Sequence, residues 1–410
     1  MMKKLLPPVA LFAAVFCVSA FCQKYTLVQQ ESLGLFLWAP DFLRMVFDSP
    51  LPFSHLLGGF LVQFFKYDWL GSIITAVLVT AVYLLCRSIA RHLGLQTSVI
   101  PMAISLLAWW LTAHSADICI VCAFVLIAAT LSLITLPLKG RLREKNLPRL
   151  TVVSIALIAV AAVLIGTNPT VRTREEMSRV ELFAVNYSWD KVLQTATPAW
   201  TKEHHDMLPF ALLALNERGE LGEKMYDYPI QGAQGLDTEG LNNRIAYTFS
   251  TLLYECLGCA NEAIHGVYQG ATYLHYGMSF RTLRQLVNYN WLLGDYALVR
   301  KYCDVLSRST AHKAFVARYE ALMASGTPRE VPPVNESYDA AVMDHDQMVD
   351  LALLVSEGIF SPITMERYLC YLLARGDLET FAAQLEKVRP YYKTLPRYFQ
   401  EALEFMNGGR

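Results

Sequence analysis

The sequence predicts an all-α protein in two parts, a bundle of transmembrane helices in residues 1–166 and a water-soluble domain of repeated helical pairs in residues 167–410. Long uncharged apolar stretches are confined to the first part, and charged residues become frequent after Thr167. Only 17% of all residues are charged, whereas soluble domains carry about 25%. The net charge of −1 provides no overall field that would attract nucleic acid, so no nucleic-acid partner is expected.

Five apolar stretches in the first part are predicted to cross the hydrocarbon core of a bilayer, which takes about 17–25 residues, and the third and fifth are near the short limit. They are Leu5–Cys22, Trp69–Cys86, Ser98–Ala113, Ile118–Leu138 and Leu150–Gly166. The segment Phe53–Phe65 also has apolar residues at helical spacing, but it is too short to cross comfortably. We expect this segment to lie in or re-enter the outer membrane interface. The lipid bilayer is therefore the first expected partner.

Basic residues determine the expected orientation, because cytoplasmic loops are rich in Lys and Arg. With five spans, the clusters Lys3–Lys4, Arg87–Arg91 and Lys139–Arg149 all fall on one side of the membrane. We therefore expect an inner-membrane protein with a cytoplasmic N-terminus and a periplasmic C-terminal domain. Residues 3–20 also resemble a secretory signal that ends in Val-Ser-Ala, and its cleavage would leave four spans with the same downstream orientation.

The second part is predicted to consist of helices of about 10–16 residues that are separated by turns containing glycine. The turn glycines are Gly219, Gly258, Gly294 and Gly376. Successive members are 39, 36 and 82 residues apart, and the last interval is close to two repeats. Such a period is typical of stacked helical hairpins, in which glycine ends one helix and Asp295 or Asp377 caps the next. Ser188 is expected to cap a helix that begins at Trp189, and the proline-rich residues 327–337 to form a loop. An irregular all-helical domain without true repeats remains the alternative.

Some runs of residues resemble known families. Residues 291–296, Trp-Leu-Leu-Gly-Asp-Tyr, resemble a tetratricopeptide (TPR) helix–turn–helix, although no unit meets the full consensus. The runs 29–31, 60–65, 68–71 and 391–402 resemble an uncharacterised family of multi-span membrane proteins from Bacteroidetes-type bacteria, a domain of unknown function with TPR-like C-terminal helices. Members of that family usually have more spans and a Pro-Gly-Gly turn where this chain has Pro50-Leu51-Pro52. The resemblance implies the two-part architecture but no chemistry.

The candidate catalytic residues are carboxylates in the predicted outer loop between the first two spans. Glu31 and Asp41 are the leading candidates there, and Asp48 and Asp68 lie in the same loop. Glycosyltransferases that use lipid-linked sugars place a catalytic carboxylate in such a loop, where it acts as a general base toward an acceptor hydroxyl. A membrane glycosyltransferase-like enzyme is therefore the alternative function. Acidic residues in a solvated loop are also ordinary in proteins without activity.

Other motifs favour structural explanations. Adjacent histidines in Glu203–Asp206 would point about 100° apart on a helix and could not easily share a metal ion. Cys119 and Cys122 lie inside a predicted span, where small residues pack between helices. Cys256 and Cys259 have redox-motif spacing, but without a nearby βαβ pattern we expect a structural disulfide or free thiols. No phosphate-binding loop or zinc-protease motif is visible, so no cofactor is expected.

The sequence therefore predicts a membrane-anchored interaction or scaffold protein rather than an enzyme. Its surface within residues 173–400 is expected to bind a protein or an envelope polymer. The middle repeats are rich in tyrosine, namely Tyr226, Tyr228, Tyr268, Tyr273, Tyr276 and Tyr289. Aromatic side chains suit binding surfaces, although core packing is their commoner use.

Overall fold

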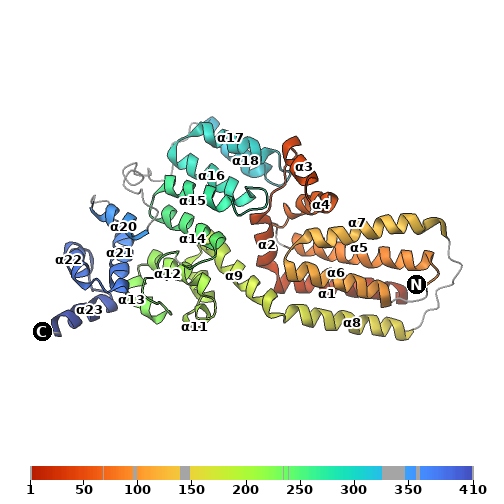
Figure 1. Cartoon of the computed structure of the whole chain (residues 1–410), viewed down its shortest axis with the longest axis horizontal. Helices are drawn as coiled ribbons and strands as arrows, with labels where there is room; N and C mark the ends of the chain where they lie inside the picture. Colours follow the sequence, from red (N-terminus) through yellow and green to blue (C-terminus); the bar gives the residue numbers. More distant parts are fainter. Residues whose placement is uncertain are drawn as a thin grey trace. The chain divides into compact units, whose positions relative to one another are not determined.

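The computed structural model describes residues 2–67, 69–95, 99–138, 148–233, 235–238, 240–325, 347–356 and 361–408. These residues form α-helices and short 3₁₀ turns without any strand, which confirms the predicted all-α class (Figure 1). They divide into two compact units. The first comprises Met1–Ser178 and Asp304–Ala317, and the second Arg179–Cys303 and Arg318–Arg410. The first unit thus extends past Thr167 and takes in a short segment from late in the chain.

Long apolar helices make up most of the first unit. They are α1 (Met2–Cys22), α5 (Leu70–His92), α6 (Val99–Ser115), α7 (Ile118–Thr135), which continues into η1 (Leu136–Leu138), and α8 (Pro148–Gly166). By length and composition, Leu5–Cys22, Leu70–His92 and Ile118–Leu138 can each cross a membrane. A fourth candidate is α8 joined to α9 (Pro169–Val185) with a bend of 51°. The remaining predicted span is α6, a helix of 17 residues.

Some residues that the sequence predictions concern lie outside the described part of the chain. They are Asp68, Ser98, residues 139–147 of one basic cluster and the predicted loop 327–337. The side chains of Lys3 and Lys4 are also outside it. The predicted orientation therefore still rests on sequence.

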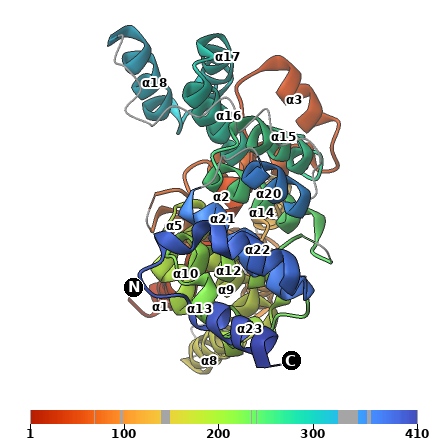
Figure 2. The same ribbon diagram turned by 90° about the vertical axis from the view of Figure 1, so that its left-hand side faces the viewer.

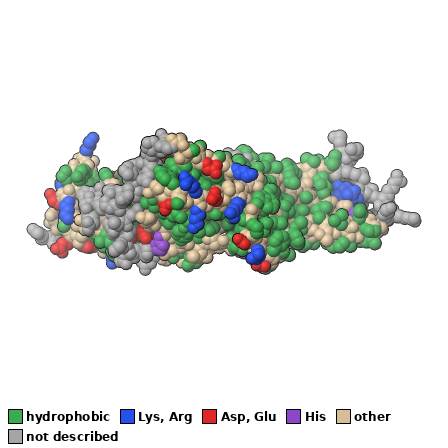
Figure 3. All heavy atoms as spheres, turned by 90° about the horizontal axis from the view of Figure 1, so that it is seen from above, with side chains coloured by type: hydrophobic (Ala, Val, Ile, Leu, Met, Phe, Trp, Pro, Cys, Tyr) green, Lys and Arg blue, Asp and Glu red, His purple; other side chains and the backbone are tan. Residues whose placement is uncertain are grey.

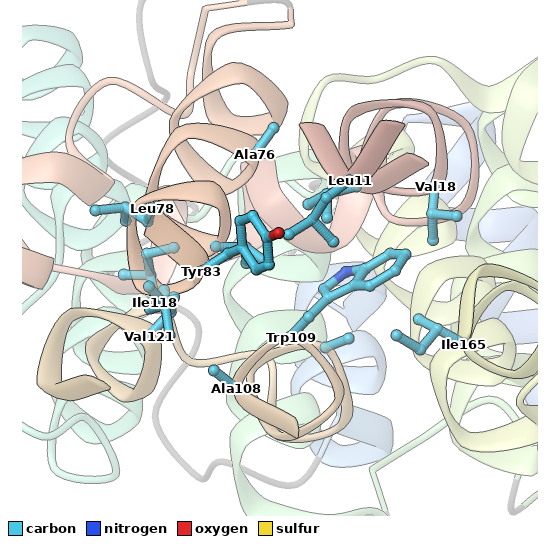
Figure 4. Close-up of a cluster of buried hydrophobic side chains, with 14 of the residues drawn as sticks. Leu11, Val18, Ala76, Leu78, Tyr83, Ala108, Trp109, Ile118, Val121 and Ile165 are labelled. Atoms are coloured by element: carbon cyan, nitrogen blue, oxygen red, sulfur yellow. The ribbon is translucent and has the colours of Figure 1, made fainter. Parts of the chain in front are cut away.

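Trp109 of α6 is the largest fully buried side chain and lies in the core of the first unit. Figure 4 shows its indole ring pointing toward Val18 of α1 and Ile165 of α8, with Tyr83 of α5 nearby. Close packing of this kind is the main attraction between helices in lipid, because lipid chains are as apolar as the side chains.

Three shorter helices follow α1 in the first unit, namely α2 (Lys24–Leu33), α3 (Pro40–Phe47) and α4 (Pro52–Val62). The predicted interfacial segment 53–65 corresponds to α4, which ends at Val62 and gives way to a turn. A Cβ atom on Gly58 would lie 2.5 Å from the Sγ atom of Cys119, so the glycine allows α4 to approach α7 closely. Cys119 therefore packs against glycine, the smallest residue.

The second unit consists mainly of short helices in antiparallel pairs, which Figures 1 and 2 show for α14–α15 and α21–α22. Three of the helices, α9, α17 and α18, cross a boundary between the units. The helices are α10 (Trp189–Thr195), α11 (Pro198–Thr201), α12 (Leu208–Glu217), α13 (Leu221–Lys224), α14 (Asn243–Cys256), α15 (Ala260–Ala271), α16 (Phe280–Leu293), α17 (Tyr296–Ser307), α18 (Lys313–Ser325), α20 (Gln347–Ser356), α21 (Pro362–Arg375), α22 (Leu378–Val388) and α23 (Arg397–Gly408). Short 3₁₀ turns are η2 (His205–Met207), η3 (Met225–Asp227) and η4 (Arg389–Tyr391).

The turn glycines have the left-handed backbone conformation that the sequence predicts. Their φ angles are +67°, +82°, +78° and +75° at Gly219, Gly258, Gly294 and Gly376. The predicted aspartate caps are also present, because Asp295 accepts from the Leu298 N–H at 3.0 Å and Asp377 from the Thr380 N–H at 3.1 Å. Ser188 is the N-cap residue of α10, which begins at Trp189 as predicted. Its side chain makes no capping bond, however, and its ψ of 61° departs from the extended conformation typical of a capping residue.

Substituting Gly376 tests the conformational role of these turns. Gly376→Ala should destabilise the second unit by about 1–2 kcal/mol, the cost of a left-handed conformation with a Cβ atom. An added Cβ would meet nothing within 4 Å, so steric overlap makes no contribution. Thermal unfolding of the full chain in detergent measures the effect. Gly408→Ala, which also adds a Cβ in open space but does not have a positive φ, is the matched control. Equal melting temperatures for the two variants would contradict this role.

Candidate functional site

A buried polar cluster in the first unit joins α2 to the late segment 304–317. The Nε2 atom of His312 lies 2.9 Å from Oε1 of Glu31, and these residues are only 1% and 2% exposed. The other ring nitrogen, Nδ1, lies 3.0 Å from the hydroxyl of Ser309, which in turn lies 3.1 Å from Oε1 of Gln63. We call Glu31, Gln63, Ser309 and His312 the Glu31 cluster.

Main-chain bonds hold the late segment at this position. Gln63 accepts from the Ala311 N–H at 3.0 Å, and Lys66 donates to the Ala311 carbonyl oxygen. The Trp38 N–H donates to the carbonyl of Arg308 at 2.9 Å, and the Trp38 indole donates to the Thr310 hydroxyl at 3.2 Å. Buried polar groups need partners because water cannot reach them. These contacts give both backbone and side chains of the segment such partners.

A second buried carboxylate, Glu175 of α9, caps the opposite end of α2. It accepts from the backbone N–H groups of Tyr25 at 2.9 Å and Thr26 at 2.8 Å, and from the Thr26 hydroxyl at 2.9 Å. The first turn of a helix has free N–H groups and a positive dipole end, so a carboxylate is favourable there. Glu31 lies in the last turn of the same helix, where a negative charge is unfavourable. His312 provides a buried hydrogen-bond partner for this carboxylate.

The Glu31 cluster contains the residue types of a Ser-His-acid catalytic triad, but its burial excludes that chemistry in this conformation. Ser309 and His312 are buried, so a substrate carbonyl cannot approach the Ser309 hydroxyl. The same reasoning applies to Glu31 as a general base, which must reach the proton of an acceptor hydroxyl. The arrangement stabilises the structure by joining two segments that are 281 positions apart.

Asp41 and Asp48, two of the other predicted loop carboxylates, are not part of the Glu31 cluster. Asp41 lies in the first turn of α3 and Asp48 follows its last residue, and both are exposed. A carboxylate in the first turn favours the helix through its dipole, which gives Asp41 a structural explanation.

The predicted histidine and cysteine motifs do not form a reactive site. His204 stacks on Trp200 with ring centres 4.1 Å apart, and the described part of the chain contains no group of metal-ligating side chains. Cys256 and Cys259 are free thiols, one of the two states expected for them. Burial raises the pKa of Cys256 well above its ordinary value. This shift disfavours the thiolate, the form that carries out redox chemistry.

The second unit also contains two carboxylates with raised pKa values, the half-buried Glu255 and the buried Glu366. Glu255 accepts from the hydroxyls of Tyr187 and Tyr289, and Glu366 accepts from the Gly222 N–H at 2.8 Å. Burial raises the pKa of Glu366 to about 7, and it also raises the pKa of Glu255. The protonated carboxyl is therefore favoured in the folded state, and each group loses stabilising free energy as it ionises.

With this geometry in place, comparison with known proteins identifies the family. The model of one family matches residues 2–171 and 151–410. The chain belongs to DUF6057, a family of unknown function. No curated protein and no solved structure gives a match. Membership agrees with the predicted resemblance to an uncharacterised family, and it assigns no chemistry to the Glu31 cluster.

Sequence reasoning placed Glu31 in a loop and did not identify its partner. Ser309 and His312 lie where α17 ends and α18 begins, a position at which polar residues are common for local reasons. Glu31 and His312 are 281 positions apart, so no spacing between them in the sequence could have indicated their contact. A burial signal was present in Gln29–Glu31, which lies only a few residues after the first apolar stretch.

His312→Ala should destabilise the first unit by about 1–3 kcal/mol, because it removes a buried hydrogen-bond partner of the Glu31 carboxylate. Asp41→Ala is the control, and it should change stability by less than about 0.5 kcal/mol, as is usual for exposed positions. Thermal unfolding in detergent measures both. The double variant Glu31→Ala with His312→Ala should lose less stability than the sum of the two single variants. Additive losses would show that the two side chains do not interact.

The raised pKa of Glu366 predicts that stability falls as pH rises from about 4.5 to about 7. Glu366→Gln keeps the site neutral, so it should flatten this part of the profile and be more stable than the parent chain at pH 8, by up to about 3 kcal/mol. Chemical denaturation of the full chain in detergent across this range checks the sign. Glu404→Gln, at an exposed position, should leave the profile unchanged. If the stability of Glu366→Gln depended on pH as that of the parent chain does, Glu366 would not be the group responsible for this dependence.

Proposed function

We propose that the chain is a membrane-anchored interaction protein of the bacterial inner membrane. Its apolar helices hold it in the bilayer, and the paired helices of residues 173–400 present a binding surface on the periplasmic side. We further propose that these pairs are degenerate TPR-type repeats. The support for repeats is the recurrence of left-handed glycine turns followed by aspartate caps at Gly294 and Gly376.

The support for the anchor is the large apolar surface that the protein itself leaves uncovered. Only 22% of the apolar window in Ile118–Leu138 is buried within the protein. Leu133, Ile134 and Val160 are among the exposed side chains, and Figure 3 shows many hydrophobic side chains on the visible face of the long apolar helices. Exposed apolar patches of this kind mark contact with a membrane or another protein.

One observation supports partner binding most directly: two tyrosines stack on each other where α14 lies beside the turn that follows α15. Tyr247 and Tyr273 have ring centres 5.6 Å apart, and Tyr273 is 50% exposed. We call Tyr247 and Tyr273 the tyrosine patch. Tyr268 of α15 is also exposed, and its hydroxyl is hydrogen-bonded to that of Tyr302. Rings held by neighbouring groups lose little entropy on binding, which suits them as anchors for a partner.

The tyrosines singled out in the sequence thus divide between two uses. Tyr289 and Tyr228 are buried and serve the core, whereas Tyr226, Tyr268 and Tyr273 are exposed. Tyr276 is half-buried beside His275, with ring centres 4.5 Å apart. An aromatic surface suits a protein segment or an envelope polymer. The competing glycosyltransferase is less well supported, because Glu31 is buried and only the exposed Asp41 of the two leading candidates remains accessible.

Photocrosslinking in native membranes tests this proposal. A photoreactive amino acid replaces Tyr276, beside the tyrosine patch, in the full chain, and captured species are identified by mass spectrometry. We expect one discrete adduct, whose yield Tyr273→Ala lowers by about tenfold, the effect of losing about 1.4 kcal/mol of binding free energy. Tyr391→Ala removes an exposed tyrosine outside the patch and should leave the yield unchanged. The absence of a discrete adduct, or equal yields from both variants, would contradict partner binding at the patch.

A further inference from the structure

The first unit contains an apolar groove beside α7 that is separate from the Glu31 cluster. Its volume is about 610 Å³. Helix α7 lines it from Asp117 to Leu131, and residues of α5 and α6, such as Ala90 and Ile104, form the facing wall. Leu51 and the start of α4 border the groove at the Asp117 end of α7.

The lining is apolar along most of its length and polar at one end. Ile120, Phe124 and Ile127 are typical of its apolar walls. His55 of α4 and Asp117, the residue before α7, also line it. Helices α4 and α7 are in contact, as the close approach of Gly58 to Cys119 shows, so both residues lie at the same end of the groove. An apolar groove with a polar end matches a molecule that has a long tail and a polar head.

The dimensions suit a single hydrocarbon chain. Fourteen residue steps from Asp117 to Leu131 correspond to about 21 Å at 1.5 Å per residue. An extended hydrocarbon chain can lie along a groove of this length and of about 610 Å³. A helix from a second copy of the chain is the competing occupant, and the experiment below distinguishes the two.

We propose that this groove binds one acyl chain of a membrane phospholipid, with its headgroup at His55 and Asp117. The imidazole of His55 can donate to a phosphate, and the carboxylate of Asp117 can accept from an amine, so a zwitterionic headgroup that bears both groups suits this end. The groove lies between candidate membrane-spanning helices, where lipid is the surrounding medium. The inference rests on the membrane anchor in the proposed function and is independent of the tyrosine patch.

The experiment uses the full chain in nanodiscs that contain phosphatidylethanolamine with a diazirine on its acyl chain. Illumination should label peptides from residues 117–131. Ala123→Trp fills the groove and should lower this labelling by about tenfold, since an indole occupies the volume of the chain. Ala129→Trp adds the same ring on the same helix at a position outside the groove lining, and it should leave labelling unchanged. Ala90→Trp, on the facing wall, should act like Ala123→Trp.

Three further readouts separate the possible results. Thermal unfolding identifies a variant that has lost its fold. The loss of labelling must therefore appear in at least one groove variant whose melting temperature equals that of Ala129→Trp. Unlabelled phosphatidylethanolamine should compete better than diacylglycerol, which lacks the charged headgroup. Labelling that is equal in all variants, or crosslinked dimers through residues 117–131 in place of lipid adducts, would overturn the proposal. Resistance of the parent chain to carbonate extraction tests the membrane anchor separately, and adduct formation at Tyr276 tests partner binding.

Discussion

The apolar surface that the protein cannot cover by itself is the constraint on which the rest of the structure depends. The apolar windows of Leu5–Cys22, Leu70–His92 and Ile118–Leu138 are buried within the protein to 39%, 44% and 22%. Exposing apolar surface to water costs about 25 cal/mol per Å², so the membrane anchor that we propose would stabilise these helices by covering this surface. A helix is suited to such a medium because it satisfies its own backbone hydrogen bonds.

Polar interactions then determine how the first unit is completed. Glu175 caps the first turn of α2, and His312 is hydrogen-bonded to Glu31 in the last turn. The chain between residues 31 and 312 contains α3 to α17, so the Glu31 cluster closes a very long loop. Loop closure of that length is costly in entropy. The bond between Glu31 and His312 is therefore expected to form late, after the intervening helices have folded.

Features that depend on local chemistry could be predicted from the sequence. Apolar runs determined where the long helices lie, and only glycine readily adopts the left-handed conformation found at Gly294 and Gly376. Helix ends were less predictable, because α5 continues to His92 although its apolar run ends at Cys86. The pairing of Glu31 could not be predicted, since its partner lies 281 positions away and shares no spacing with it. The groove beside α7 depends on how four helix segments pack, which composition alone does not specify.

The orientation of the chain in the membrane tests the proposed function most directly. A phosphatase that is active only in the periplasm and a fluorescent protein that folds only in the cytoplasm can be fused in turn to Arg410. An odd number of spans, with Lys3 and Lys4 inside, requires phosphatase activity without fluorescence. Fluorescence without phosphatase activity would place the paired helices and the tyrosine patch in the cytoplasm, and it would contradict both the topology and the proposed periplasmic role.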